Sequence, residues 1–347
     1  MNVVFGVDRN FLYPALLSAY SVVKNASRPV DVTIFGQDFT AQDIAAVEQL
    51  DRAVDNGTVR YREFQSETLG RFSEFKTKDP KITLLPLFLP DFFSGRCLFI
   101  DADTLVLGDV CELQDLDMNG HGIGACVDMG LVTLGEGRFL RPSLQTVLRP
   151  GHEHQKSVTR VLRSIRLGFL PGENYFNAGI LLMDCEAIRN SPAGKELGDF
   201  DKLIPHIHDL PEQDRMNQIF AGQWLRLPQQ WNTRPQIWYD AHSPKFRHTS
   251  AEFRDQLKQA SRNPKMWHYI GGKKPWRAKP ASQILLRRAF RDYQEYLVLF
   301  EDETGLTFSV KGGELAQLSK KPPGHRSGGF LLSGCSRLGA VDGTGLP

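Results

Sequence analysis

The sequence contains no long apolar segment and no paired-cysteine motif. No run of about eighteen apolar residues occurs along its 347 residues, so we expect no membrane-spanning helix. The five cysteines are odd in number and form no C-x-x-C pair, which favours buried thiols in a reducing compartment. No charged segment precedes the apolar N-terminus, so we expect no signal peptide and a cytoplasmic protein.

An excess of one charge is also missing. Lysine and arginine number 42 against 40 acidic residues, and the formal net charge of +2 gives no reason to expect a nucleic-acid partner. The composition, 41% hydrophobic and 24% charged, is that of an ordinary soluble globular protein. The chain shows no internal repeats, and its length fits one large α/β domain or two small ones.

Strand-like and helix-like segments alternate through the first half of the chain. Residues 2–7 predict a strand, and residues 14–24 place apolar side chains at helical spacing. We therefore expect an α/β fold in which helices flank a Rossmann-like mixed sheet, with one main domain over residues 1–300. Further strands are expected at 32–35, 60–64, 97–101, 122–127 and 178–183, with a helix capped by Thr40.

The most informative segment is an apolar strand that ends in two carboxylates, Asp101 and Asp103. Ionised carboxylates beside a buried strand are costly unless they are paired or bound to a metal. Two later apolar runs are also followed by an acid, Asp128 and Asp184. Polar groups at strand ends form the ligand crevice of open α/β sheets. The pair therefore predicts a divalent-cation site at one edge of the sheet.

Two regions interrupt the alternation. Between Arg138 and Arg166 there are seven basic residues and one acid, so residues 129–172 are either a solvated helix and loop or an inserted loop that contacts an anionic acceptor. Residues 312–347 are rich in Gly, Ser and Pro without a hydrophobic period, which predicts a disordered tail. Such a tail is compatible with a weak, peripheral contact of the protein with the inner face of a membrane.

Five segments, taken in order, resemble glycosyltransferase family 8, whose members are retaining GT-A enzymes that use UDP-sugars. The resemblance extends from residue 2 to residue 280. A single Asp-x-Asp would be weak evidence, whereas five segments in the same order are specific. The segments are Val7-Asp8-Arg9-Asn10, Asp101-Ala102-Asp103, Asn174-Tyr175-Phe176-Asn177-Ala178-Gly179, Pro211-Glu212-Gln213-Asp214-Arg215-Met216-Asn217 and Trp267-His268-Tyr269-Ile270-Gly271-Gly272-Lys273-Lys274-Pro275-Trp276.

The resemblance implies that Asp101, Asp103 and His268 hold Mn²⁺ or Mg²⁺ against the donor diphosphate. Carboxylates suit hard cations, and one imidazole favours manganese. The metal would neutralise the departing diphosphate as a Lewis acid. In the same reading Gly271 lets the backbone approach phosphate, and Lys274 adds a positive charge. Contacts with the rest of the donor are implied for Val7, Asp8, Asn10, Asp101, Ala102 and Asn177.

The resemblance also implies three residues around the reacting sugar, Asp128, Glu212 and Gln213. Gln213 matches an amide whose oxygen stabilises an oxocarbenium-like state. Many relatives carry Asp in place of Glu212, and the longer side chain would shift sugar choice or bring a carboxylate nearer the reacting carbon. Structural roles remain open: Glu212 complements a helix dipole, Asp8 and Asn10 cap the first helix, and Asn177 forms a turn.

One expected residue is missing. Relatives commonly carry an arginine on a donor-contacting helix ahead of the acidic pair, but the segment Lys81 to Pro90 has none. Two alternatives are open: Lys76, Lys78 or Lys81 supplies the positive charge, or the donor is held differently.

The motifs together predict a metal-dependent retaining hexosyltransferase. It would move galactose or glucose from a UDP-sugar to a hydroxyl of a cell-surface glycan or glycolipid, such as lipopolysaccharide. The alternatives are a non-catalytic or hydrolytic nucleotide-sugar-binding relative, and a nucleotidyltransferase or pyrophosphatase. The last class would require a glycine-rich phosphate loop after the first strand, and Val7-Asp8-Arg9-Asn10 offers none. The oligomeric state is left open.

Overall fold

The structure is a computed structural model. It describes residues 1–65, 80–132, 167–169, 172–197, 199, 211–247, 249–272, 274–277 and 286–307. Most of the loop predicted at 129–172, namely residues 133–166, lies outside the described residues, and so does the tail predicted at 312–347. Lys76 and Lys78, offered as substitutes for the missing arginine, also lie outside them.

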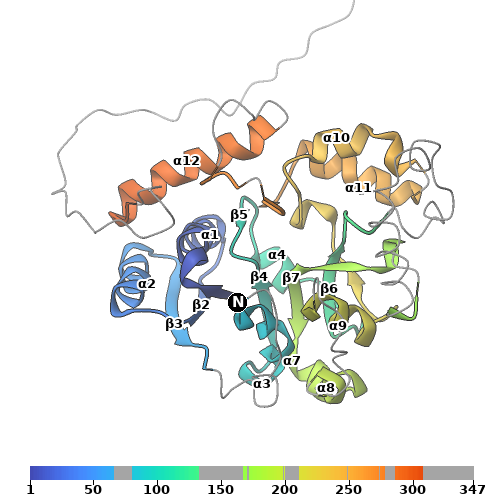
Figure 1. Cartoon of the computed structure of the whole chain (residues 1–347), viewed down its shortest axis with the longest axis horizontal. Coiled ribbons are helices and arrows are strands. Elements are labelled where there is room, and N and C mark those ends of the chain that lie inside the picture. Colours follow the sequence, from blue (N-terminus) through green and yellow to red (C-terminus); the bar gives the residue numbers. More distant parts are fainter. Residues whose placement is uncertain are drawn as a thin grey trace, which may run out of the picture.

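A mixed sheet of seven strands forms the centre of the molecule (Figure 1), in the order β3-β2-β1-β4-β7-β6-β8. Strands β1 to β4 are parallel to one another, whereas β7 runs antiparallel to both β4 and β6. This arrangement confirms the predicted α/β class. The strands are β1 (Asn2–Asp8), β2 (Val30–Gln37), β3 (Gly57–Glu63), β4 (Arg96–Ile100), β6 (Ile123–Val127), β7 (Phe176–Asp184) and β8 (Leu225–Arg226).

The direction of β7 decides which polar groups share an edge of the sheet. Because β7 is antiparallel, its first residues lie where β4 and β6 end, and its last residue, Asp184, lies at the opposite edge. There Asp184 accepts a hydrogen bond from the Ala187 amide and lies 3.9 Å from Arg96. Asp184 does end a strand, but the expectation that it shares a ligand crevice with Asp128 is wrong.

The inner strands are apolar on both faces because helices cover the sheet from both sides. All five residues of β6 are buried, and so are the last four of β4. The first helix, α1 (Leu12–Asn25), is buried over most of its length and contacts α12 (Arg287–Thr304). Thr40 and Asp43 form a reciprocal capping box at the start of α2 (Ala41–Ala53), which confirms the expected cap.

A second, two-stranded sheet brings a distant segment to the acidic pair. Strand β5 (Thr104–Val106) pairs antiparallel with β9 (Met266–His268), and Thr104 lies opposite His268. Hydrogen bonds from α1 hold β5: Ser18 Oγ lies 2.6 Å from Thr104 Oγ1, and the Val106 amide donates to Ser21 Oγ. Neither strand was expected from the sequence.

Short helices complete the described part of the chain. Within the described ranges, none of the helices has the length and apolar character needed to cross a membrane. In Figure 1, α10 (Ile237–His242) and α11 (Ala251–Arg262) lie together on one side of the molecule and α12 lies over α1. The remaining elements are η1 (Arg9–Phe11), η3 (Lys81–Leu87), α3 (Leu89–Phe92), α4 (Cys111–Gln114), η6 (Gly172–Asn174), α7 (Cys185–Arg189), α8 (Pro192–Leu197), α9 (Pro211–Ile219), η8 (Gln229–Trp231) and η9 (Pro244–Phe246).

Candidate active site

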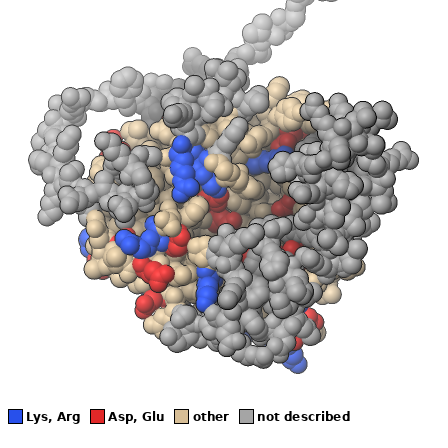
Figure 2. Space-filling model, in the orientation of Figure 1, with Lys and Arg blue, Asp and Glu red and all other residues tan. Residues whose placement is uncertain are grey.

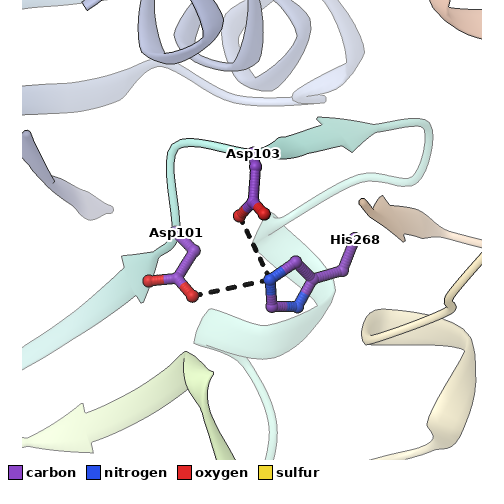
Figure 3. A group of neighbouring side chains, drawn as sticks. All are labelled: Asp101, Asp103 and His268. Carbon is purple, nitrogen blue, oxygen red and sulfur yellow. Dashed lines mark ion pairs between the residues drawn. The ribbon is translucent and has the colours of Figure 1, made fainter. Parts of the chain in front are cut away.

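The structure brings together the three residues predicted to bind a metal (Figure 3). Nε2 of His268 lies 3.2 Å from Oδ1 of Asp103 and 3.5 Å from Oδ2 of Asp101. One ligand atom from each residue lies within 4.8 Å of the others. Asp101 follows β4, Asp103 precedes β5, and His268 ends β9. The side chain of Asp101 is 42% exposed and that of His268 only 3%, so the cluster opens to solvent on the Asp101 side.

The donor set and its surroundings fit a hard divalent cation. Two carboxylates with one imidazole match the ligands that Mn²⁺ and Mg²⁺ take in proteins. The neighbouring backbone leaves space only because residue 179 is glycine. A Cβ atom at Gly179 would lie 2.4 Å from Asp101 Oδ2 and 2.5 Å from His268 Cε1. Asp101, Asp103 and His268 are therefore the residues that would hold such an ion.

Charges around the cluster favour its ionised form. Burial alone would raise the pKa of the Asp103 carboxyl, but His268 and Lys274 outweigh burial and lower it. Nζ of Lys274 donates to Asp103 Oδ2 and, at 2.7 Å, to the carbonyl of Tyr269. Burial alone would lower the pKa of His268, but Asp103 and Asp101 raise it to about 9. A cation that binds Nε2 must therefore displace a proton.

A second cluster, beside the first, contains the residues predicted to surround the reacting sugar. Nδ2 of Asn177 donates to Gln213 Oε1 at 3.1 Å and to Asp128 Oδ2 at 3.3 Å. Nε2 of Gln213 also donates to Asp128 Oδ2, at 3.3 Å. These residues come from β7, α9 and the loop after β6. Glu212, which precedes Gln213 on α9, is half-buried.

The amide of Gln213 is held at both ends. Its Oε1 accepts from Asn177 and from the Ala178 amide at 3.0 Å, and its Nε2 donates to Asp128 and, at 3.1 Å, to the hydroxyl of Tyr175. The hydroxyl of Tyr175 in turn donates to Asp214. Gln213 is only 3% exposed, so it presents a fixed dipole and not a mobile side chain.

Tyr175, Asp214 and Asn217 were not singled out in the sequence, although they lie within the quoted segments. The Asn217 side chain accepts from the Phe176 amide at 2.8 Å and donates to the Phe176 carbonyl at 2.9 Å. It therefore fixes α9 along the start of β7. The available signal was spacing, since residues 214 and 217 lie on one face of a helix.

Asn232, directly after η8, was also missed. Its side chain contacts both clusters: it lies 3.0 Å from Nδ1 of His268 and donates to Oδ1 of Asn177 at 2.8 Å. Asn232 is 3% exposed. No motif in the sequence marks this position.

The residues predicted to contact the nucleotide lie at the same edge of the sheet. Asp8 ends β1, where its carboxylate accepts hydrogen bonds from the Phe11 amide and from the Asn10 side chain. Asn10 is exposed, while Val7 and Ala102 are buried. Of the two residues for which a helix cap was the structural alternative, Asp8 caps the first helical turn and Asn10 does not.

An aromatic contact joins the first loop to the Gly271–Lys274 loop. The rings of Phe11 and Trp276 meet edge to face with centroids 6.3 Å apart, and Nζ of Lys274 lies 5.9 Å from the first and 5.8 Å from the second. Gly271 has φ of +86°, a conformation that favours glycine. Of the three lysines proposed to replace the missing arginine, Lys81 is the one within the described residues. It begins η3, which packs on β1 at Gly6.

Figure 2 shows acidic side chains recessed in the middle of this face, with basic side chains next to them. The contacts of the Asn232 side chain with His268 and Asn177 join the two clusters into one polar site, with a cation-binding end and an amide-rich end. Such a site suits a ligand that carries a diphosphate next to a polyhydroxyl group.

The sequence profile of the family described as glycosyl transferase family 8 matches residues 2–279. General stress protein A of Bacillus subtilis (strain 168) is 27% identical over 197 residues, which make up 55% of this chain and 56% of that protein. The chain thus spans little more than half the length of that relative. Lipopolysaccharide 1,2-glucosyltransferase of Escherichia coli (strain K12) is 22% identical over 286 residues, 80% of this chain and 72% of the relative. Lipopolysaccharide 1,3-galactosyltransferase of Salmonella typhimurium (strain LT2) is 25% identical over 296 residues, 82% and 77% respectively.

Solved structures agree on the fold. The crystal structure of an active-site mutant of LgtC superposes with a TM-score of 0.64 at 20% identity, and the match covers 86% of this chain and 96% of that one. The expected GT-A fold is thereby confirmed. Because the family profile covers most of the sequence, from the first strand through the Gly271–Lys274 loop, the chain belongs to glycosyl transferase family 8.

Proposed function

We propose that this glycosyltransferase is a metal-dependent, retaining hexosyltransferase that moves galactose or glucose from a UDP-sugar to a glycan or glycolipid hydroxyl. The observation that carries the proposal is the cluster of Asp101, Asp103 and His268 at the edge of the sheet where β4 ends. A site of two carboxylates and one imidazole, open on one side, suits a cation that must also accept phosphate oxygens.

When bound, Mn²⁺ or Mg²⁺ would neutralise the charge that develops on the departing diphosphate. Lys274 supplies a second positive charge from the opposite side of Asp103. Gly271, exposed and in a left-handed conformation, offers backbone that can approach phosphate closely. Val7, Asp8, Asn10 and Ala102, at the ends of β1 and β4, would contact the uridine, with Asp101 reaching towards the ribose.

The amide-rich end would hold the transferred sugar. Asp128 and Asn177 would accept and donate hydrogen bonds to its hydroxyls, with Gln213 as the fixed dipole nearest the reacting carbon. Both lone pairs of Gln213 Oε1 already accept hydrogen bonds, from Asn177 and Ala178. Stabilisation of an oxocarbenium-like state by Gln213 would therefore require one of these bonds to lengthen. Departure and attack on one face of the sugar would give retention without a covalent intermediate.

Lipopolysaccharide is the proposed type of acceptor. Two relatives are named for glucosyl or galactosyl transfer to lipopolysaccharide, and residues 138–166 carry a positive excess suited to an anionic acceptor. We place the reaction in the cytoplasm, with a peripheral membrane contact at the acceptor. The four described cysteines, all buried and free, suit a reducing compartment.

The test is an assay with UDP-glucose and UDP-galactose, with and without Mn²⁺, on lipopolysaccharide core acceptors. The proposal expects transfer with one donor, dependence on the metal, and an anomeric configuration equal to that of the donor. No turnover of either donor would contradict it.

A non-catalytic or hydrolytic nucleotide-sugar-binding relative is the second candidate, and the absence of an arginine between Lys81 and Pro90 favours the non-catalytic form. A non-catalytic relative binds UDP without turnover of either donor. In the same assay a hydrolase releases free hexose at a rate that added acceptor does not change. A transferase releases UDP faster when acceptor is added.

A further inference from the structure

We propose that Asn232 is a positioning residue that fixes the metal-facing nitrogen of His268 and couples it to Asn177 at the amide-rich end of the site. The inference rests on the proposed metal-dependent transfer and adds a residue that no motif of the chain marks. Asn232 contacts neither the proposed ion nor the donor directly. It acts through its two neighbours, each of which belongs to one end of the site.

The direction of every hydrogen bond in this chain of contacts follows from one backbone amide. The Gly179 N–H can only donate, and it lies 3.1 Å from Oδ1 of Asn177. That atom is therefore the carbonyl oxygen, and the amide nitrogen of Asn177 faces Gln213 and Asp128. This assignment agrees with the Asp128 carboxylate, which accepts hydrogen bonds only.

The orientation of Asn232 follows in the same way. Its group at 2.8 Å from Oδ1 of Asn177 must be the donor Nδ2, because an oxygen there would face an oxygen. The carbonyl Oδ1 of Asn232 then faces His268 Nδ1 at 3.0 Å, so Nδ1 carries a proton and donates it. Nε2 is left as the nitrogen that faces Asp101 and Asp103. A histidine that binds a metal through one ring nitrogen usually donates the N–H of the other to a carbonyl or carboxylate oxygen, as His268 donates to Asn232 here.

Burial makes the arrangement costly to break. Asn232 and His268 are each 3% exposed, so water does not readily replace a lost partner. The backbone of Asn232 is separately anchored, since its amide donates to Gln229 O and its carbonyl accepts from Gln229 Nε2. The neighbouring Thr233 bonds to β9 on both sides of Trp267. The side chain of Asn232 is thus free for the two site contacts.

Two substitutions separate the two ends. Asn232→Leu removes both contacts at similar volume. Asn232→Asp keeps an acceptor for His268 Nδ1 but loses the donor to Asn177. Mn²⁺ affinity, measured by the loss of free Mn²⁺ signal in electron paramagnetic resonance, reports on the His268 end without turnover. The kcat of transfer at saturating Mn²⁺ reports on the Asn177 end.

The proposal expects Asn232→Leu to weaken Mn²⁺ binding by about 10- to 100-fold. Asn232→Asp keeps the Mn²⁺ affinity of the wild type but lowers kcat. The matched control is Gln229→Leu, which disturbs the same turn and the backbone of Asn232 but neither side-chain contact. It is expected to keep both Mn²⁺ affinity and kcat.

Several results would overturn the inference. These are wild-type Mn²⁺ affinity in Asn232→Leu, equal losses in Asn232→Leu and Gln229→Leu, or a loss of Mn²⁺ affinity in Asn232→Asp. If Asn232→Leu does not fold, Asn232→Asp alone tests the inference, by whether its kcat falls while its Mn²⁺ affinity stays at the wild-type value. If the wild-type protein binds no Mn²⁺, the proposed function itself is contradicted, and this inference with it. The Mn²⁺ titration of the wild type therefore separates failure of the proposed function from failure of the inference alone.

Discussion

Gly179 lies directly against the Asp101 carboxylate: its carbonyl accepts the Asp101 amide at 2.7 Å, and a Cβ on it would lie 2.4 Å from Asp101 Oδ2. The contact continues the antiparallel pairing of β4 and β7 one residue beyond Ile100 and Ile180. The carboxylate and the imidazole of His268 therefore share the space that a side chain at this position would fill.

Gly179→Ala is expected to weaken Mn²⁺ binding by at least about tenfold while the protein still folds. The added methyl group overpacks the site at a cost of about 1–3 kcal/mol, and the side chains that must move are the metal ligands Asp101 and His268. Electron paramagnetic resonance measures the binding and thermal unfolding measures the stability. Gly124→Ala is the control: its Cβ would press on Leu227 at 3.2 Å, within the core of the sheet. Equal Mn²⁺ affinity in both variants would show that Asp101 and His268 do not need this space.

Asp103→Asn is expected to abolish both Mn²⁺ binding and transfer. Asp103 is the more buried carboxylate of the cluster, 13% exposed against 42% for Asp101, and both positive neighbours, His268 and Lys274, contact it. Removing its charge leaves these cations uncompensated. The control Asp255→Asn neutralises an exposed acid on α11 and should change neither measurement. Transfer by Asp103→Asn that still depends on Mn²⁺ would contradict the proposed metal site.

Much of this architecture could be predicted from the sequence. Strands β1 to β4 were predicted from their sequence patterns, and the Thr40 cap was placed correctly, because both follow from local burial and hydrogen bonding. The two-residue strand β8, parallel to β6, was not predicted. The direction of β7 could not be predicted, since periodicity carries no information about which neighbour a strand pairs with. For that reason Asp184 was assigned to the wrong edge, whereas Asn177, at the other end of the same strand, lies in the site.

The site was predictable only where a motif supplied the residues. Asp101, Asp103 and His268 were grouped by resemblance, and the pairing of β5 with β9 provides the physical reason that they meet. Asn232 belongs to no quoted segment, and a single asparagine after a short turn has no distinguishing pattern. Its contact with His268 exists because η8 and β9 lie side by side in the folded chain, and its second contact is with Asn177 of β7.

Mn²⁺ affinity is expected to rise with pH, because Asp103 and Asp101 outweigh burial and raise the pKa of His268 to about 9. Below that pH the imidazole holds the proton that the cation must displace. The apparent Kd should therefore fall about tenfold per pH unit up to about pH 9 and then level off. Titrations between pH 6.5 and 8 check the slope. His268→Asn should bind more weakly and with no such slope, and an equal slope in that variant would assign the proton elsewhere.

Trp276→Leu is expected to weaken UDP binding in the presence of Mn²⁺. The Trp276 and Phe11 rings hold Lys274, and a cation–π contact of about 1 kcal/mol corresponds to about fivefold in Kd. Calorimetry with UDP measures the effect. Trp238→Leu is the control, because Trp238 is 64% exposed on α10. Equal losses in the two variants would mean that the contact with Lys274 is not the cause.

Gln213→Met is expected to lower kcat about 100-fold while Mn²⁺ affinity stays at the wild-type value. Methionine has a similar length but cannot replace the hydrogen bonds to Asn177, Asp128, Ala178 and Tyr175, so the fixed dipole is lost. Initial rates at saturating donor and acceptor measure kcat, and paramagnetic resonance measures Mn²⁺ binding. Gln259→Met, at an exposed position of α11, is the control and should behave as the wild type. Undiminished kcat in Gln213→Met would remove Gln213 from the reaction, whereas a joint loss of kcat and Mn²⁺ affinity would make it part of the scaffold of the metal site.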